Sequence, residues 1–257
     1  MSEFDVVVVG SLNLDLVVRS SRHPLPGETL TGGDYAEIAG GKGLNQAVCA
    51  ARSGARVAMI GAVGDDHAGE YLRDIVRGEG IDDTLIATRA GVATGRALIT
   101  VDEAGENSII IVPGANATVA IDHLPDSRVV LTQLETTIDT VLDAFGSARA
   151  RGATTVLNPA PAAELPDELF DLCDVLVPNE HEVELLGGRR ALVERVGRLV
   201  VTLGAAGAEL VGVDGTTPVP PCRVDPVDTT GAGDAFCGSL AARLAAGDDS
   251  ADALRYA

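Results

Sequence analysis

The sequence predicts an α/β fold, a doubly wound and mainly parallel sheet flanked by helices. Short apolar, β-branched runs recur along the 257 residues, and Ala/Leu-rich segments with a helical pattern separate them. Continuous apolar runs of this length are typical of parallel strands that are covered on both faces. We expect the sheet to consist of the runs 6–9, 57–60, 129–131, 155–157, 175–177 and 199–202.

Three further stretches depart from this alternation, namely 28–38, 96–101 and 107–112. The last two flank the turn-like segment Asp102-Glu103-Ala104-Gly105-Glu106, so two strands follow each other with no helix between them. We therefore expect a small antiparallel β lid, with strands drawn from about 12–38 and 94–114. Because no linker or repeat interrupts the sequence, residues 1–257 are expected to form one α/β domain that carries this lid.

The composition of the chain argues against several classes of binding partner and of metal or disulfide site. A net charge of −19 argues against nucleic acid and against an anionic membrane surface. The sequence has no uncharged run of about 18 residues and no signal-peptide pattern, so we expect a cytoplasmic protein. The four cysteines are scattered without C-x-x-C spacing, which is typical of small buried thiols rather than of a zinc site or a disulfide framework.

A glycine-rich junction near the C-terminal end carries the strongest functional signal. Asp228-Thr229-Thr230-Gly231-Ala232-Gly233-Asp234 leads directly into an apolar, helix-like stretch. Glycines let backbone N–H groups approach an anion, and the start of a helix favours negative charge, so Gly231, Ala232 and Gly233 form a candidate anion hole. A carboxylate there would repel a phosphate unless it had a task, which makes Asp234 a candidate general base for phosphoryl transfer. The alternative is an ordinary helix start with a Thr or Asp cap.

Two upstream motifs suit a polyhydroxylated ligand. Gly40-Gly41-Lys42-Gly43-Leu44-Asn45-Gln46-Ala47 places an amide and a cation at the start of a helix-like segment, and its spacing is not that of a Walker A loop. Asn13 and Asp15 directly follow the strand-like run 6–9, where open α/β sheets bind ligands. The alternative for this second pair is a turn-forming role.

Together these motifs resemble the ribokinase branch of the PfkB carbohydrate kinase family. The segments 40–47 and 228–234 look like its two signature regions, and 10–15 looks like its opening strand and sugar loop. The resemblance extends from about Val6 to the last residue, in the order of the family. Further matching runs are Val63-Gly64-Asp65-Asp66, Gly105-Glu106-Asn107, Pro113-Gly114-Ala115-Asn116, Gln133-Leu134-Glu135, Asn158-Pro159-Ala160-Pro161, Pro178-Asn179-Glu180-His181-Glu182 and Thr202-Leu203-Gly204.

The resemblance implies a ribokinase-like fold and ATP-dependent phosphorylation of D-ribose to D-ribose 5-phosphate, with Mg²⁺ and K⁺ as cofactors. It also implies that the lid closes over the sugar and forms a homodimer contact. Asp234 would accept the proton of the sugar hydroxyl. The other roles implied by matching positions are sugar binding by Asn13, Asp15, Gly41, Lys42, Asn45 and Glu135, nucleotide binding by Asn179, Glu182, Thr202, Gly204 and Gly207, K⁺ binding by Asp228 and Thr230, and Mg²⁺ binding through water by Glu182.

The chain departs from the family at its C-terminal end. The family continues well past the segment 249–257 with a part that walls the adenine pocket and completes the cation site, so we expect this end to be truncated and K⁺ activation to be weak. The segment 250–257 begins a helix whose apolar residues are expected to lack a packing partner; they are Ala251, Ala253, Leu254 and Tyr256.

Two alternatives remain. The first is another PfkB kinase that acts on adenosine, fructose or a sugar acid. With four Phe, three Tyr and no Trp, the chain has few aromatic residues for a nucleobase platform. The second is a non-catalytic sugar-binding protein that has lost ATP turnover with the missing C-terminal part.

Overall fold

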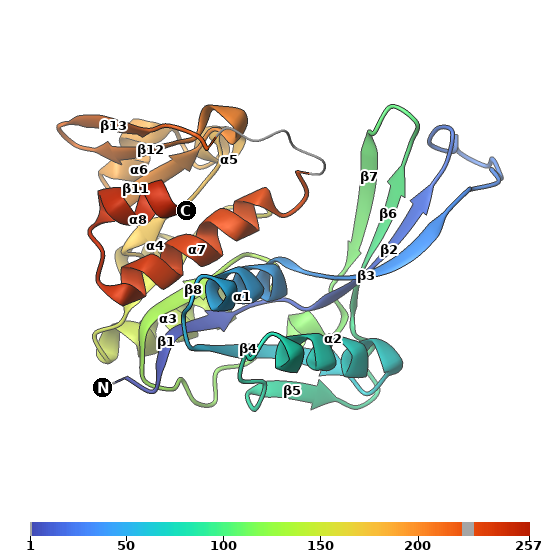
Figure 1. Cartoon of the computed structure of the whole chain (residues 1–257), viewed down its shortest axis with the longest axis horizontal. Helices are drawn as coiled ribbons and strands as arrows, with labels where there is room; N and C mark the ends of the chain where they lie inside the picture. The colour runs from blue at the N-terminus through green and yellow to red at the C-terminus, as the bar shows by residue number, and fades with distance from the viewer. Residues whose placement is uncertain (1, 223–228) are drawn as a thin grey trace.

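The computed structural model describes residues 2–222 and 229–257. Its centre is a sheet with the strand order β13-β12-β11-β10-β9-β8-β1-β4-β5 (Figure 1). All neighbours from β11 to β5 are parallel, whereas β12 and β13 add an antiparallel hairpin at one edge. The strands are β1 (Phe4–Val9), β4 (Val57–Gly64), β5 (Ile86–Arg89), β8 (Ser127–Thr132), β9 (Thr154–Leu157), β10 (Val175–Leu176), β11 (Arg198–Thr202), β12 (Ala208–Gly212) and β13 (Gly215–Val219).

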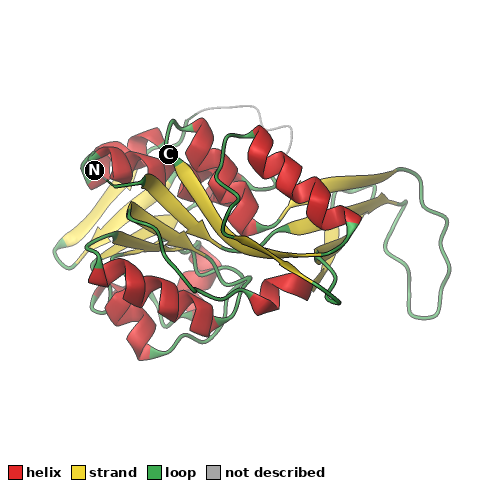
Figure 2. Cartoon of the chain, turned by 90° about the horizontal axis from the view of Figure 1, so that it is seen from below, coloured by secondary structure: helices red, strands yellow, loops and turns green. Residues whose placement is uncertain are grey.

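Helices cover both faces of this sheet, as Figure 2 shows. Alternate residues of β1 point to opposite faces, so Val6 and Val8 enter one apolar core while Val7 and Val9 enter the other. The first core is covered by α1 (Lys42–Arg52), α2 (His67–Gly78), α7 (Ala232–Ala246) and α8 (Ser250–Tyr256). The second is covered by α3 (Ile138–Ala150), α4 (Asp167–Leu172), α5 (Glu180–Leu185), α6 (Arg189–Val193) and the 3₁₀ turn η1 (Gly114–Thr118).

These layers confirm the predicted fold class. Every apolar run that we expected to be a strand lies in the central sheet, and it is buried on both faces because the helices cover it. Among the described residues, no helix is long and apolar enough to cross a membrane.

The lid is a second sheet that projects from the layered body (Figure 1). Its strand order is β3-β2-β6-β7, and its strands are β2 (Asn13–Arg19), β3 (Tyr35–Gly40), β6 (Gly95–Val101) and β7 (Asn107–Val112). The outer pairs are antiparallel, while the central pair β2–β6 is parallel. The expected strand 28–38 begins only at Tyr35, because the residues before it form a loop.

Asp66 ties the lid to the body. Its carboxylate caps α2 by accepting from the Gly69 N–H at 2.9 Å, and it also accepts from the Thr94 N–H at 3.0 Å, directly before β6. The Arg96 guanidinium of β6 lies 3.6 Å from the same carboxylate. The base of the lid is therefore anchored to the start of a helix of the main body.

The C-terminal helix α8 corrects one expectation. Ala253 and Leu254 were expected to lack a packing partner, yet their exposed fractions are 0% and 2% because they pack into the core beside α7. Tyr256 is exposed, and its ring lies 4.8 Å below the Arg243 guanidinium of α7. Helix α7 supplies the partner that local sequence did not reveal.

Helices α1 and α7 pack at very short range, side by side in Figure 1. A Cβ atom on Gly238 would lie 2.4 Å from the Gln46 carbonyl oxygen and 2.8 Å from Cys49 Cβ, so only glycine fits. Asp234 lies one turn before Gly238 on α7, so it faces the beginning of α1. This contact positions the candidate base.

We therefore predict that Gly238→Ala lowers the free energy of unfolding by about 1–3 kcal/mol, as overpacking does. Gly146→Ala in α3 is the matched control, because a Cβ atom there meets nothing within 4 Å. That control should raise stability by about 0.5–1 kcal/mol, as expected for Gly→Ala in a helix. Urea unfolding of both variants tests this. Equal stability of Gly238→Ala and the parent chain would contradict the close helix contact.

Candidate functional site

The predicted site residues meet at one edge of the central sheet, where its parallel strands end. Asn13 comes soon after β1, Glu135 follows β8 and Asn179 follows β10. Parallel strands bring their carboxyl ends to the same edge, which is where open α/β sheets bind ligands.

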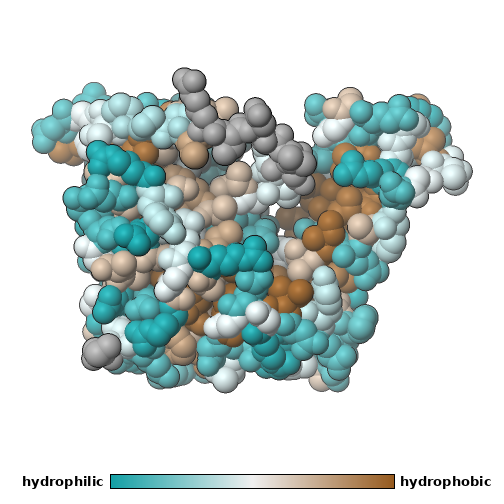
Figure 3. Space-filling model, in the orientation of Figure 1, coloured by the Kyte–Doolittle hydropathy of each residue, from teal (hydrophilic) through white to brown (hydrophobic). Residues whose placement is uncertain are grey.

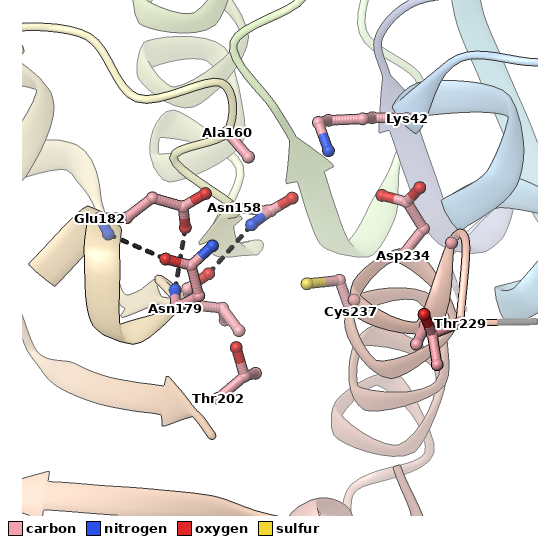
Figure 4. A pocket seen from close by; sticks show the side chains of 13 residues that line it. Lys42, Asn158, Ala160, Asn179, Glu182, Thr202, Thr229, Asp234 and Cys237 are labelled. Atoms are coloured by element: carbon pink, nitrogen blue, oxygen red, sulfur yellow. Dashed lines mark hydrogen bonds between the residues drawn. The ribbon is translucent and has the colours of Figure 1, made fainter. Parts of the chain in front are cut away.

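A cavity of about 150 Å³ opens at this edge (Figure 4). Lys42 and Asp234 lie on one side of it, and Asn179 and Glu182 lie on the opposite side. The lining residues are Lys42, Asn158, Ala160, Val177, Asn179, Glu182, Thr202, Thr229, Gly231, Ala232, Gly233, Asp234 and Cys237. The structure thus brings the predicted anion hole, the candidate base and three of the five predicted nucleotide residues to one cavity.

Asp234 is held from both sides of its carboxylate. It lies in the first turn of α7 and is 6% exposed. Its Oδ2 accepts from Asn45 Nδ2 at 3.0 Å, and its Oδ1 accepts from Gln46 Nε2 at 2.9 Å. Both donors come from the first turns of α1, so the carboxylate is aimed by a neighbouring helix and not by its own loop.

The anion hole is built by the start of α7. Gly231 caps this helix with a positive φ of 75°, a conformation that favours glycine. The Ala232 N–H donates to the Thr229 carbonyl at 3.2 Å, whereas the Gly233 N–H belongs to the first turn and has no partner within the helix. The positive end of the helix dipole therefore faces the cavity.

Glu135 is bound to the glycine loop before α1. Its Oε2 accepts from Ser11 Oγ at 2.5 Å and from the Lys42 N–H at 3.0 Å. The Ser11 hydroxyl oxygen in turn accepts from the Gly43 N–H at 3.2 Å. These bonds join the ends of β1 and β8 to the start of α1.

Asn13 and Asp15 lie on β2, at the base of the lid. Asn13 is buried, and its Oδ1 accepts from Asn116 Nδ2 at 2.8 Å. Burial, together with the charge of Glu135, raises the pKa of the Asp15 carboxyl to about 6. Among the described residues, Asp15 Oδ1 is buried without a hydrogen-bond partner. An unpaired carboxylate oxygen at this position is suited to accept a hydrogen bond from a hydroxyl group of a ligand.

On the far side of the cavity, Asn179 and Glu182 form a capping box at the start of α5. Asn179 Oδ1 accepts from the Glu182 N–H at 2.8 Å, and Glu182 Oε2 accepts from the Asn179 N–H at 2.9 Å. Burial raises the pKa of Glu182, while the bond from Asn179 and the positive charge of Lys42 oppose that rise. The other carboxylate oxygen, Oε1, has no protein partner in the described part of the chain, so this side chain fits an outer-sphere Mg²⁺ ligand.

The remaining nucleotide residues lie at different distances from the cavity. Thr202 lines it, whereas Gly204 and Gly207 belong to the turn η2 (Gly204–Ala206) and its end, beyond β11. A Cβ atom on Gly207 would lie 2.3 Å from the Val219 carbonyl oxygen, so this glycine is needed for packing against β13. His181, between Asn179 and Glu182 in sequence, is exposed.

The predicted K⁺ site is described only in part. Asp228 lies outside the described residues, and Thr230 is an exposed residue just before α7.

Sequence reasoning assigned no role to several polar residues that the site uses. Gln46, Gln133, Asn116 and Asn158 are all buried and hydrogen-bonded to the predicted residues or to one another. Each stands in one of the runs that matched the family, and that was the only available signal. Cys237 was expected to be a small buried thiol, and it also lines the cavity, with its sulfur directed inward in Figure 4. Cys222, in contrast to that expectation, is exposed because it lies in the chain segment after β13.

The raised pKa of Asp15 predicts a pH-dependent stability. The folded chain holds this proton up to about pH 6, whereas the unfolded chain releases it near 3.8, so ionisation in between destabilises the fold. The stability difference between Asp15→Asn and the parent chain should therefore grow in favour of the variant from pH 4 to pH 7. Urea unfolding without ligand across that range measures it. A difference that does not change with pH would contradict the burial of this charge.

Comparisons with known proteins identify the family of the chain. The model of the pfkB family carbohydrate kinases matches residues 3–257. The ribokinase of Bacillus subtilis is 37% identical over 264 residues, which cover 98% of this chain and 90% of that protein. The bifunctional ribokinase/ribose-5-phosphate isomerase A of Fructilactobacillus sanfranciscensis is 37% identical over 93% of this chain, which spans only about half (48%) of that protein.

The fold has a close counterpart among solved structures. The Arabidopsis thaliana ribokinase complexed with ribose and ATP superposes with a TM-score of 0.89, at 28% identity, and the match covers 99% of this chain and 90% of that one. The family model matches nearly the whole chain, and the Bacillus subtilis ribokinase is 37% identical to it. The chain belongs to the pfkB family of carbohydrate kinases and is an ATP-dependent sugar kinase.

Proposed function

We propose that this kinase transfers the γ-phosphoryl group of ATP to the 5-hydroxyl of D-ribose. The observation that carries the proposal is the place of Asp234. Its carboxylate accepts a hydrogen bond from Asn45, one of the residues expected to bind the sugar, and it lines the cavity that also contains three of the predicted nucleotide residues. Relatives named ribokinase support ribose as the acceptor.

In the proposed mechanism, Asp234 accepts the proton of the attacking hydroxyl while the new O–P bond forms and the bond to the ADP oxygen breaks. Asp15 Oδ1, Glu135 and Asn13 hold the other hydroxyls of the sugar. The N–H groups of Gly231 and Gly233 and the positive end of the α7 dipole stabilise the charge that builds up on the transferred group.

The charge of the cavity argues for a metal partner of the nucleotide. Among its described lining residues, Lys42 is the only cation, while Glu182 and Asp234 are acids. The formal charges of these three side chains therefore add up to −1. ATP is a polyanion, and Lys42 together with a helix dipole would compensate only part of its charge. We propose that Glu182 holds hydrated Mg²⁺, which neutralises the phosphates when it is bound. The cytoplasm, where ATP is available, is the proposed place of action.

A first test is a panel of acceptors in a coupled assay for ADP release. D-Ribose should be turned over with a kcat/KM at least about tenfold above those of D-fructose and adenosine, a ratio that corresponds to about 1.4 kcal/mol of transition-state discrimination. Preferred turnover of adenosine, or ATP hydrolysis that does not depend on any acceptor, would contradict the ribose assignment.

A second test addresses the base. Asp234→Asn keeps the size and the acceptor oxygen of the side chain but cannot take a proton at neutral pH. It should lower kcat by about 10²–10⁴-fold, the usual contribution of general base catalysis, and leave the Kd for ribose within a few-fold of the parent value. Stopped assays and calorimetry measure the two quantities. A variant that keeps most of its kcat would show that the proton leaves by another route.

We also propose that two copies of the chain associate through the lid. Strand β7 forms an edge of the lid sheet, and its Ile109, Ile110 and Ile111 have exposed fractions of 50%, 64% and 42%. Long apolar edge strands are normally covered by another chain. Figure 3 shows that apolar side chains gather on the lid where it faces the hollow beside the main body.

Sedimentation velocity tests this association. The parent chain should sediment as a dimer at micromolar concentration, and Ile110→Lys should shift it to the monomer. Leu185→Lys is the matched control, because Leu185 is 61% exposed on α5 of the main body. This control should stay dimeric. A monomeric parent chain, or dissociation of both variants alike, would contradict a lid interface.

The K⁺ site proposed at Asp228 and Thr230 can be examined in the same preparations by comparing kcat in K⁺ and in Na⁺.

A further inference from the structure

Asp234 stands at the end of a chain of buried side-chain amides. Gln133, directly after β8, donates from Nε2 to Gln46 Oε1 at 2.7 Å. Gln46, on α1, donates from Nε2 to Asp234 Oδ1 at 2.9 Å and to Asn158 Oδ1 at 3.1 Å. Gln46 and Gln133 are both 0% exposed. Neither of them lines the cavity, so neither contacts the substrates there.

In this series of amides, groups that can only accept a hydrogen bond determine which side chain donates and which accepts. The Val177 carbonyl accepts from Asn158 Nδ2 at 3.0 Å, which turns the Asn158 oxygen toward Gln46. The Asp234 carboxylate is also an acceptor, so the NH₂ group of Gln46 must face both oxygens. Its own oxygen is thereby turned to Gln133, which must donate. Reversing the Gln46 amide would set three oxygens against one another in a buried place.

We propose that Gln46 and Gln133 are positioning residues for the base: Gln46 aims the Asp234 carboxylate, and Gln133 acts through Gln46 by holding its amide in the donating direction. This inference rests on the proposed role of Asp234 in the kinase reaction. Asn45 holds Oδ2 and Gln46 holds Oδ1, so the bond from Gln46 keeps the carboxylate from rotating about its Cβ–Cγ bond.

Gln133 has a further feature that suits this role. Its Oε1 is buried and has no hydrogen-bond partner among the described residues, so hydrogen bonding of this oxygen does not explain why a glutamine lies here. A Cβ atom on Gly10 would lie 2.1 Å from this oxygen, so the glycine at the end of β1 leaves room for it. The side chain is thus accommodated at a cost, and what it provides is the bond to Gln46.

The test is a double-mutant cycle on kcat with Gln46→Met and Gln133→Met, which keep side-chain length and remove the amide. Gln46→Met should lower kcat by about 10- to 100-fold, the size expected for a hydrogen bond to a charged group. Gln133→Met should lower it by a smaller factor. Because Gln133 acts only through Gln46, the double variant should have the kcat of Gln46→Met alone.

Two further readouts separate this role from a purely structural one. The loss in Gln46→Met should appear in kcat, while the Kd for ribose stays within a few-fold of the parent value. Thr132→Val is the matched control, because Thr132 is also 0% exposed, lies next to Gln133, and has no hydrogen bond from Oγ1 in the described structure. This control should keep the parent kcat.

Three results would overturn the proposal: multiplicative effects of the two substitutions on kcat, a Kd for ribose that weakens by as much as kcat falls, or the same loss of kcat in Thr132→Val. Asp234→Asn in the same assay distinguishes this failure from that of the proposed function. If Asp234→Asn loses kcat and Gln46→Met does not, only the positioning role is wrong. If Asp234→Asn retains kcat, the assignment of the base fails and the positioning role fails with it.

Discussion

The close packing of α7 against α1 is the contact on which the site depends. Each helix begins at the same edge of the sheet, so two positive helix ends and two glycine loops converge there. Gly238 lets the helices approach until Asp234 on one of them reaches Asn45 and Gln46 on the other. A separation larger by the size of one methyl group would break both bonds. The candidate base is therefore a product of helix packing.

The electrostatics of the site follow from this arrangement. In a chain with a net charge of −19, the acids Glu182 and Asp234 line the cavity, and burial together with the charge of Glu135 raises the pKa of Asp15. Backbone N–H groups, the helix dipoles and Lys42 provide the positive potential locally, where a phosphoryl group would lie. The same acidic groups have oxygens to spare for hydroxyl donors, as Asp15 Oδ1 shows. In the proposed function, anion binding and sugar binding thus use different groups within one small volume.

Much of the fold could be read from the sequence, because buried parallel strands are apolar throughout and glycine turns mark the helix starts. The residues of the two signature loops were found in the same way, since their spacing relative to a helix is local information. Leu254 was misjudged, because its burial depends on α7, which approaches it only in the folded chain. The short strand β5 and the hairpin of β12 and β13 were not anticipated, as their sequences lack a long apolar run.

The amides show where sequence reasoning ends. Gln46, Gln133 and Asn116 stand in recognisable runs, but a glutamine or asparagine in a sequence carries no information on whether it is buried or in which direction its amide points. For Gln46, those properties arise from contacts with Gln133, Asn158 and Asp234, which lie 87, 112 and 188 positions away in the sequence. The pKa of Asp15 is another property of this kind, since it depends on burial at the base of the lid and on the charge of Glu135.

The central claim is that an acceptor hydroxyl and the phosphates of ATP meet at Asp234. The most direct measurement is identification of the product by ³¹P and ¹³C NMR after incubation of the chain with ATP, Mg²⁺ and D-ribose labelled at C5. The account predicts D-ribose 5-phosphate, with coupling between the phosphorus and the labelled carbon. Release of inorganic phosphate alone, or a phosphate on any other oxygen of the sugar, would contradict it.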